Sequence, residues 1–446
     1  MKRGHYTILV TITTLLLIVN ITAFNPMLNN DNVIAENQAN DVDSAILDSY
    51  TLWTTTEVVS TESSQRSLRP SIAVDSKDNV HIVWHDLTNY NGAGSDEDIF
   101  YKCWNATTRS WTTTIIVSTE SNGNSVAPSI AIDENDNIHI VWRDPTNYLG
   151  SGSDWDIFYK QRFSNGTWKA AEVVSTESTF NVIWLHIAVK NDEAHVVYQD
   201  NTNYLGSGSD NDIMYKKRFI NGTWTVAEVV STESNLLSRF PFIVIDNDLN
   251  PHISWQDSTN YLSSGSDEDI FYKWKDSSTG IWSSAEIIST ESWAESQRVS
   301  MVIDDTGNKH LVYFDSSNYN GAGSDRDIFY KSWNTSSSTW NAAEVISTES
   351  SSSSEVPYLI SDKLGNLHCF WFDTTNINGA GIDQDIVHKI WNSTLESWGS
   401  VRVISTDSTG NSWRPVAAID SMYVIHVVWL DITPNYKGSG IDIDIF

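Results

Sequence analysis

Short apolar runs separated by polar turn residues recur along the chain. Around residues 70–118 they read PSIAVD, VHIVWHD, DIFYKCW and WTTTIIVS, each bounded by Gly, Asn, Ser or Asp. Runs of this length that are rich in β-branched and aromatic residues indicate strands, and no sustained helical period accompanies them. The pattern therefore predicts an all-β protein built from units of four strands.

The units repeat with a nearly constant period of 56 to 58 residues. The marker is the tetrapeptide STES, or STDS in the last copy, which begins at Ser60, Ser118, Ser175, Ser231, Ser289, Ser347 and Ser405. Four short strands per repeat are typical of a β-propeller blade. We therefore predict a seven-bladed β-propeller over residues 51–446, with a chain of β-sandwich domains as the alternative.

The two ends of the repeat region complement each other. Residues 53–63 (WTTTEVVSTES) match the fourth strand and following loop of the first repeat (WTTTIIVSTES, 111–121), whereas the last repeat stops within its third strand at Phe446. We expect the N-terminal segment to supply the outer strand that closes the ring. The missing end of the third strand indicates a truncated last blade. We also expect lysines of third strands to face glutamates of fourth strands, in the pairs Lys160–Glu172, Lys216–Glu228, Lys273–Glu286 and Lys331–Glu344.

Composition and charge narrow the classes of partner. The 57 acidic residues exceed the 27 basic ones, which gives a formal charge of −30 and disfavours nucleic acid and anionic membranes. The N-terminus has a basic start and an apolar stretch at 6–19, which indicates a signal peptide over 1–24 or an uncleaved anchor, followed by a linker at 25–50. We therefore expect a secreted or cell-surface monomer. Two cysteines in non-equivalent strands do not suggest a disulfide.

Two turns between third and fourth strands, SNGTW (164–168) and KDSSTGIW (275–282), resemble a degraded Asp-box, S-x-D-x-G-x-x-W. Together with PSIAVDSKDNVHIVW (70–84), they make residues 51–446 similar to the sialidase-like propellers of the bacterial neuraminidase repeat. This resemblance implies a pocket at one mouth of the central channel. It also implies that catalysis would need three arginines, a Tyr with a Glu, and an Asp. No copy has the whole Asp-box, and many members are not enzymes.

Unique chemistry in a propeller must use residues that differ between blades. Arginine precedes the first strand in only some repeats, as Arg69 in LRPSIAVD, Arg298 in QRVSMVID and Arg414 in WRPVAAID, with Arg239 one position earlier in its repeat. At the channel mouth such arginines could bind a carboxylate or sulfate. The alternative is that they only balance nearby aspartates. For hydrolase chemistry, only Glu295, Glu355 and Tyr358 lie near suitable loops.

Aspartates crowd the loop between the second and third strands of every repeat, first seen as DLTNYNGAGSDED. They are Asp86, Asp96 and Asp98; Asp144, Asp154 and Asp156; Asp200, Asp210 and Asp212; Asp257, Asp267 and Asp269; Asp315, Asp325 and Asp327; and Asp373, Asp383 and Asp385, with a seventh set in the last repeat. Oxygen ligands on a glycine-bearing loop suit Ca²⁺, although the spacing is not that of an EF-hand. Turn capping by aspartate with glycine at positive φ is the alternative.

The opposite end of each blade carries glycosylation sequons of the form N-x-[ST] at Asn105, Asn165, Asn221, Asn334 and Asn392. The functional hypotheses are therefore three. The favoured one is a non-catalytic propeller that binds a glycan or extracellular protein, with calcium as the one candidate cofactor. The others are a sialidase-like hydrolase that uses Arg69, Arg298 and Arg414, and a structural surface-layer component.

Overall fold

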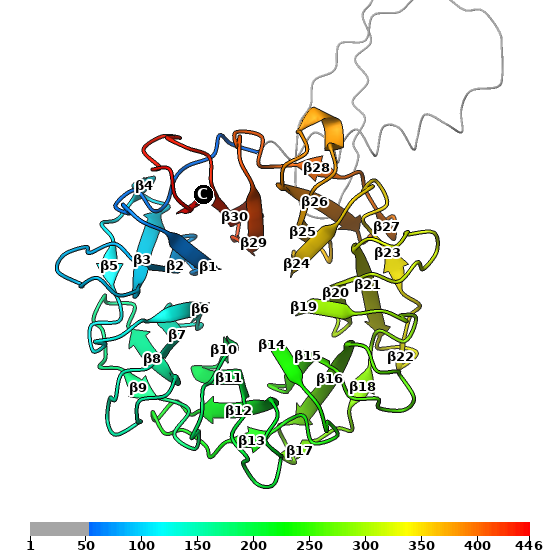
Figure 1. Cartoon of the computed structure of the whole chain (residues 1–446), viewed down its shortest axis with the longest axis horizontal. Helices are drawn as coiled ribbons and strands as arrows, with labels where there is room; N and C mark the ends of the chain where they lie inside the picture. The colour runs from blue at the N-terminus through cyan, green and yellow to red at the C-terminus, as the bar shows by residue number, and fades with distance from the viewer. Residues whose placement is uncertain (1–52) are drawn as a thin grey trace, which may run out of the picture. The chain divides into compact units, whose positions relative to one another are not determined.

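A computed structural model describes residues 53–446, so the predicted signal peptide and linker lie outside the described residues. Residues 53–446 form seven antiparallel sheets arranged around a central channel (Figure 1). This confirms the predicted seven-bladed β-propeller. Within the described part of the chain, no helix is long and apolar enough to cross a membrane.

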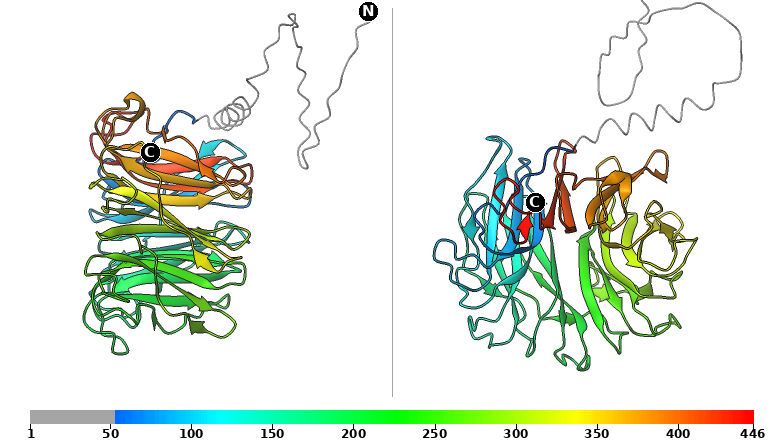
Figure 2. Two further views of the ribbon diagram at one scale, coloured as in Figure 1. Left: turned by 90° about the vertical axis from the view of Figure 1, so that its right-hand side faces the viewer. Right: turned by 45° about the horizontal axis from the view of Figure 1, so that its top comes forward.

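The blades share one order of strands, from the channel outward. The inner strands are β1 (Ser67–Val74), β6 (Val126–Ile132), β10 (Leu185–Lys190), β14 (Ser238–Ile245), β19 (Ser296–Ile303), β24 (Ser354–Ser361) and β29 (Ser412–Ile419). The second strands are β2 (Val80–Asp86), β7 (Ile138–Asp144), β11 (Glu193–Asp200), β15 (Pro251–Asp257), β20 (Lys309–Asp315), β25 (Leu367–Asp373) and β30 (Ile425–Asp431). Seen from the side in Figure 2, the strands run between the two faces of the ring.

The outer half of each blade is more irregular. The third strands are β3 (Asp98–Asn105), β8 (Asp156–Arg162), β12 (Asp212–Arg218), β16 (Asp269–Asp276), β21 (Asp327–Asn334), β26 (Asp385–Asn392) and β31 (Asp444–Ile445). Short outer strands follow as β4 (Ser110–Trp111) and β5 (Ile115–Ile116), β9 (Glu172–Val173), β13 (Glu228–Val229), β17 (Ile281–Trp282) and β18 (Glu286–Ile287), β22 (Thr339–Trp340) and β23 (Glu344–Val345), and β27 (Ser397–Trp398) and β28 (Arg402–Val403). A single 3₁₀ turn, η1 (Ile377–Gly379), lies between β25 and β26.

The N-terminal segment takes the outer position of the seventh blade, as the sequence predicts. The backbone N–H of Val59 donates to the carbonyl of Ile445 at 2.8 Å. The same bond joins Val117 to Ile99 in the first blade, at 2.7 Å. Val58 is buried in the core between the sixth and seventh blades, and Val59 in the core between the seventh and first blades, so both ends of the described chain contribute to one closed ring.

Apolar side chains from facing sheets fill the space between neighbouring blades. Trp84, Trp142, Trp255 and Trp371 are almost completely buried on the second strands. The Trp84 indole N–H donates to Asp86 at 3.1 Å, which satisfies the one polar atom of the ring. The seven blades are therefore joined by a continuous series of interblade cores rather than by one central core.

A bulge at the start of the inner strand turns one residue toward the channel in every blade except the third. The β1–β2 pairing shifts register between Leu68 and Ser71, and Arg69 adopts a left-handed backbone with φ 53°. Equivalent residues with positive φ are Ala127, Phe240, Arg298, Val356 and Arg414. Strand β10 pairs without a shift, and Trp184 precedes it. These residues supply the first ring of side chains around the channel mouth.

The expected lysine–glutamate pairs across third and fourth strands are wrong by one residue of register. In the third blade Tyr215, not Lys216, faces Glu228. The lysines instead reach the connector that precedes their own blade, where Lys216 Nζ lies 2.7 Å from Glu177. The ion pairs are Lys102–Glu62, Lys160–Glu120, Lys216–Glu177, Lys273–Glu233, Lys331–Glu291 and Lys389–Glu349. The repeated glutamate of STES therefore joins neighbouring blades.

Candidate ligand site at the channel mouth

The bulges, the connectors and the aspartate-rich loops all lie on one face of the ring. Ser67 pairs with Asp86 across β1 and β2, and Asp86 pairs with Asp98 across β2 and β3. The three residues form one row at the same end of the blade, and the same row recurs in other blades. Any ligand of the mouth therefore approaches over the aspartate-rich face.

The structure brings Arg69, Arg298 and Arg414 together at this mouth. Arg69 and Arg298 both stack on Trp184, with guanidinium carbons 4.0 and 4.8 Å from the ring centroid. Arg298 also lies 3.5 Å from the centroid of Phe240. Stacking fixes the plane of a guanidinium and leaves its N–H edges available to an anion. Three blades thus contribute arginines to one centre.

These arginines lie close to each other, and the nearby acids Glu97, Glu268 and Glu355 oppose their repulsion without forming ion pairs with them. Burial lowers the pKa of Arg69 to about 9, and repulsion from Arg414, Arg143 and Arg298 adds to the effect. Burial, followed by repulsion from Arg414, lowers the pKa of Arg298 to about 10. Among residues 53–446, no carboxylate forms an ion pair with any of the three. The mouth therefore concentrates positive charge in a protein that is otherwise strongly acidic.

Arg239 does not join this group. Phe240 occupies the bulge position of its blade, and Arg239 instead pairs with Gln256 in the β-ladder. Its guanidinium lies 3.2 Å from Glu268 and is about one-third exposed. Of the four arginines that the sequence singles out, three converge and one is neutralised at the rim.

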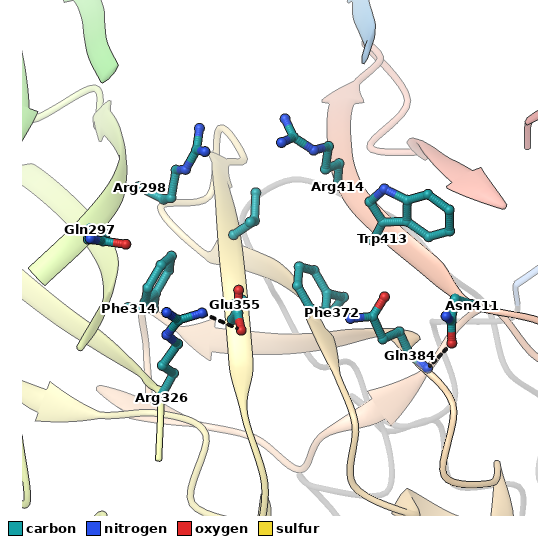
Figure 3. Close-up of a pocket in the computed structure, with 11 residues that line it drawn as sticks. Gln297, Arg298, Phe314, Arg326, Glu355, Phe372, Gln384, Asn411, Trp413 and Arg414 are labelled. Atoms are coloured by element: carbon teal, nitrogen blue, oxygen red, sulfur yellow. Dashed lines mark hydrogen bonds and ion pairs between the residues drawn. The ribbon is translucent and has the colours of Figure 1, made fainter. Parts of the chain in front are cut away.

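A cavity of about 470 Å³ opens beside the arginines, between the fifth and seventh blades (Figure 3). Arg298 and Arg414 extend to the same side of it, and Arg326 donates to Glu355 at 2.8 Å. Its wall combines amide and aromatic side chains, namely Gln297, Gln384, Asn411, Phe314, Phe372 and Trp413. Amides that exchange hydrogen bonds with hydroxyls, next to flat apolar rings, suit a sugar.

Sequence reasoning missed several charged residues of the mouth. Arg143 stacks on Trp155 at 5.0 Å and donates to the carbonyl of Val182 at 3.1 Å. Glu97 has a pKa raised by burial, although Arg66, Arg69 and Arg143 oppose the shift. Arg143 precedes Asp144, the repeated aspartate that ends a second strand. Glu97 precedes Asp98, the repeated aspartate that begins a third strand. The two positions differ between repeats, so aligning them in the sequence would have identified these residues.

His85 is buried within the electrostatic range of Arg69 and Arg143. Burial lowers its pKa to about 3, and the nearby arginines lower it further, so the imidazole is neutral at physiological pH. Its Nδ1 accepts from the backbone N–H of Ala127 at 3.3 Å. His85 therefore holds the bulge of the next blade in place and adds no charge to the mouth.

The residues considered for hydrolase chemistry have other roles. Burial raises the pKa of Tyr358 to about 12, which disfavours the phenolate that a nucleophilic Tyr needs. Tyr358 lies near Phe242, with ring centroids 6.4 Å apart. Glu355 is paired with Arg326, and Glu295 is exposed and accepts only from Gln297, at 3.2 Å. The geometry does not assemble a sialidase-type nucleophile.

The repeated aspartates of the loops lie in different environments. Asp86 accepts hydrogen bonds from the Thr88 N–H, Ser67, Ser63 and the Trp84 indole. Asp98 accepts from Ser118 at 2.7 Å, while its other oxygen is buried without a partner. Burial, together with the Asp96 and Asp144 charges, raises the pKa of Asp98 to about 6. Within residues 53–446, no three acidic, His or Cys side chains come together in a way that could hold a metal ion.

The sequon asparagines lie in the turns at the opposite end of the blades. The Asn165 side-chain oxygen accepts from the backbone N–H of Thr167 at 3.0 Å, and Asn221 accepts from Thr223 in the same way. Asn105, Asn334 and Asn392 accept from the N–H groups that follow them. Their carbonyl oxygens therefore cap the turns, and glycosylation stays a prediction.

Comparison with solved structures finds the same overall fold in two polysaccharide lyases, at low sequence identity. An ulvan lyase, bound to -[GlcA(1-4)Rha3S]-, is 13% identical with a TM-score of 0.55, over 87% of this chain and 95% of the other. The polysaccharide lyase Uly1 is 11% identical with a TM-score of 0.51, over 84% and 89%. The intramolecular trans-sialidase from Ruminococcus gnavus is 11% identical with a TM-score of 0.42, over 88% and 96%. The chain matches no protein-family model and no curated protein.

Proposed function

We propose that this propeller binds an anionic glycan at its channel mouth, as a secreted or cell-surface binding module. The observation that carries the proposal is the group of Arg69, Arg298 and Arg414, which converge from three blades without carboxylate partners. Partly buried cations that repel each other are costly, and an anion that accepts their forked hydrogen bonds relieves that cost. The bound group would be a carboxylate or a sulfate.

The adjoining cavity supports a sugar rather than a free inorganic anion. Its volume of about 470 Å³ is much larger than a sulfate needs, and amide and aromatic side chains line it. The ulvan lyase with the same fold is bound to a sugar chain that contains glucuronic acid and a sulfated rhamnose. In this mode the acid group would contact the arginines while the pyranose ring occupies the cavity near Trp413.

Calorimetric titration with D-glucuronate, and with glucose as the uncharged match, tests the proposal. We expect Arg298→Gln to weaken glucuronate binding by about 10- to 100-fold, since one charge-assisted contact contributes about 1.5–3 kcal/mol. Arg109→Gln is the matched control because Arg109 is exposed in a turn at the opposite end of a blade. Equal affinity of the wild type for glucose and glucuronate, or of both variants for glucuronate, would refute the proposal.

Cleavage of the bound glycan is the second candidate, and Glu97 is the observation that favours it. Its carboxyl has a raised pKa, has no side-chain hydrogen bond, and lies in the electrostatic range of Arg69 and Arg143. Burial favours the protonated form of a carboxyl, and a protonated carboxyl can donate a proton to a leaving oxygen. Incubation with glucuronate-containing oligosaccharides would then release new reducing ends, and Glu97→Gln would abolish the release without weakening binding. Absence of new reducing ends would leave the protein a binding module.

A further inference from the structure

One connector on the mouth face carries a side chain that no other repeat has at that position. Trp293 directly follows the STES tetrapeptide that precedes the fifth blade. The six equivalent residues are all small and polar, namely Ser64, Asn122, Thr179, Asn235, Ser351 and Thr409. Trp293 is 62% exposed, and no other tryptophan of residues 53–446 is exposed. This face therefore presents one indole ring to solvent.

The fold of the blade does not require this ring. The backbone N–H of Trp293 donates to the Ser317 hydroxyl at 2.9 Å. In the second blade the backbone N–H of Asn122 donates to Thr146 in the same way, at 3.0 Å, so the turn also forms with a short polar side chain. Within residues 53–446 the Trp293 indole stacks on no other ring, and its N–H has no hydrogen-bond partner. The ring is therefore available to a ligand.

The blade that bears Trp293 also builds a wall of the arginine cavity. Gln297, Arg298 and Phe314 belong to this fifth blade and line the cavity (Figure 3). Gln297 follows Trp293 by four residues, a span of at most about 14 Å even in a fully extended chain. Glu295, which lies between them, accepts a hydrogen bond from the Gln297 amide at 3.2 Å. The indole therefore lies at the rim of the cavity, within reach of a short oligosaccharide.

We propose that Trp293 forms an outer subsite, which stacks on a neutral sugar of the glycan whose anionic group binds the arginines. The inference rests on the proposed binding of an anionic glycan and specifies the ligand as an oligosaccharide. A pyranose ring has an apolar face of C–H groups, and an indole offers a large flat apolar surface with few rotatable bonds to immobilise. The connector at 289–295 contains two glutamates and no cation, so the stacked unit is uncharged.

The test compares D-glucuronate with a tetrasaccharide that links one terminal glucuronate to three neutral xyloses, in calorimetric titrations. We expect the wild type to bind the tetrasaccharide about tenfold more tightly than glucuronate, the factor that one stacked ring contributes. Trp293→Ser introduces the residue that the first and sixth blades carry, and it should lower tetrasaccharide affinity to that of glucuronate. Phe180→Ser is the matched control, since this 56% exposed aromatic residue lies on the connector before the third blade, outside the cavity wall.

The possible outcomes distinguish this inference from the proposed function. Equal affinities of the wild type for the two ligands, or equal effects of Trp293→Ser and Phe180→Ser, would overturn the outer subsite and leave anionic binding at the mouth intact. Loss of affinity for both ligands by the same factor in Trp293→Ser would also overturn it, because the indole would then act on the mouth itself. Tetrasaccharide binding that depends on Trp293 but ignores Arg298→Gln would keep the stacking contact and overturn the proposed anionic binding.

Discussion

At the scale of single residues, the bulge has the same backbone in most blades but carries different side chains. Arg69, Arg298 and Arg414 have φ values of 53°, 58° and 56°, in a region that costs a non-glycine residue roughly 1–2 kcal/mol. Ala127 and Val356 have the same backbone in blades where no arginine occupies the bulge. The positive φ therefore belongs to the blade fold, whereas the side chain at this position can differ from blade to blade.

Replacing one arginine should stabilise the ligand-free protein. We expect Arg414→Gln to raise the free energy of unfolding by about 1 kcal/mol, because it removes a partly buried cation that repels Arg69 and Arg298. Chemical denaturation without ligand measures this change. Arg326→Gln is the matched control and should not stabilise, since it leaves Glu355 without its partner. A less stable Arg414→Gln protein would mean that the three arginines are already compensated.

Only some residues of the mouth could be identified from the sequence. Arg69, Arg298 and Arg414 stand out because one position varies among nearly identical repeats. Arg143, Arg326 and Glu97 lie in repeat positions that vary equally, but their proximity to the arginines depends on closure of the ring. The roles of Trp184 and Phe240 depend on contacts between blades, which no periodicity within one repeat encodes.

At the scale of elements, the STES connector joins three parts of neighbouring blades. Ser118 donates to Asp98 of the preceding blade, and Ser121 donates to Asp144 of the following one. The glutamate between them, Glu120, lies 2.7 Å from buried Lys160. The repeat was evident from the sequence, but the lysine partner was not. The hairpin register places the lysine ammonium toward the connector rather than toward the outer strand.

Loss of one such lysine should cost more stability than loss of a surface charge. Lys331 is 2% exposed, and its ammonium donates to the Ile288 carbonyl, to Thr290 and to Glu291. We expect Lys331→Met to lower the free energy of unfolding by about 2 kcal/mol, since these acceptors lose a common donor. Guanidinium denaturation measures the loss, and Lys363→Met, at an exposed turn, is the control. Equal stability of the two variants would show that water replaces the ammonium.

The third-strand aspartates make stability depend on pH in an unusual direction. Burial raises the pKa of Asp98, Asp156 and Asp212 to about 6 in the folded protein. An acid whose pKa is raised by folding stabilises the native state below its unfolded pKa, near 4, and this contribution is lost as pH rises through about 6.

Between about pH 7 and about pH 5 the aspartates therefore favour a rising melting temperature, whereas buried histidines with a lowered pKa, such as His85, oppose it. Below that range the effect reverses, because hydrogen bonding lowers the pKa of Asp133 and Asp246 to about 2 and their contribution is lost on protonation. Calorimetry in EDTA on the wild type and on Asp98→Asn isolates the aspartate contribution, because the histidines act equally in both proteins. We expect the wild type to gain melting temperature relative to the variant as the pH falls through about 6. A melting temperature that instead climbs with millimolar CaCl₂ at pH 7 would show that calcium, rather than protons, neutralises these loops.

At the scale of the whole molecule, the fold was almost fully predictable because each local signal repeats seven times. The strand count, the blade order and the closing segment were all read from the spacing of STES and from the match of residues 53–63 to 111–121. The candidate site lacks this redundancy. Its residues differ between blades, so its geometry appears only when the ring brings them to a common axis.

Ring closure by the N-terminal segment should determine whether the propeller unfolds as one unit. Trp53 packs on His388, with ring centroids 5.4 Å apart, while buried Val58 lies between the sixth and seventh blades and Val59 between the seventh and first. We expect a chain that begins at Thr61 to lose roughly 5 kcal/mol of stability, from the exposure of these side chains and their neighbours. Hydrogen exchange should then show β29 and β30 opening before the other blades. A chain that begins at Trp53 is the control, because it keeps these contacts. Uniform exchange in the shorter chain would mean that the remaining blades close the ring without this segment.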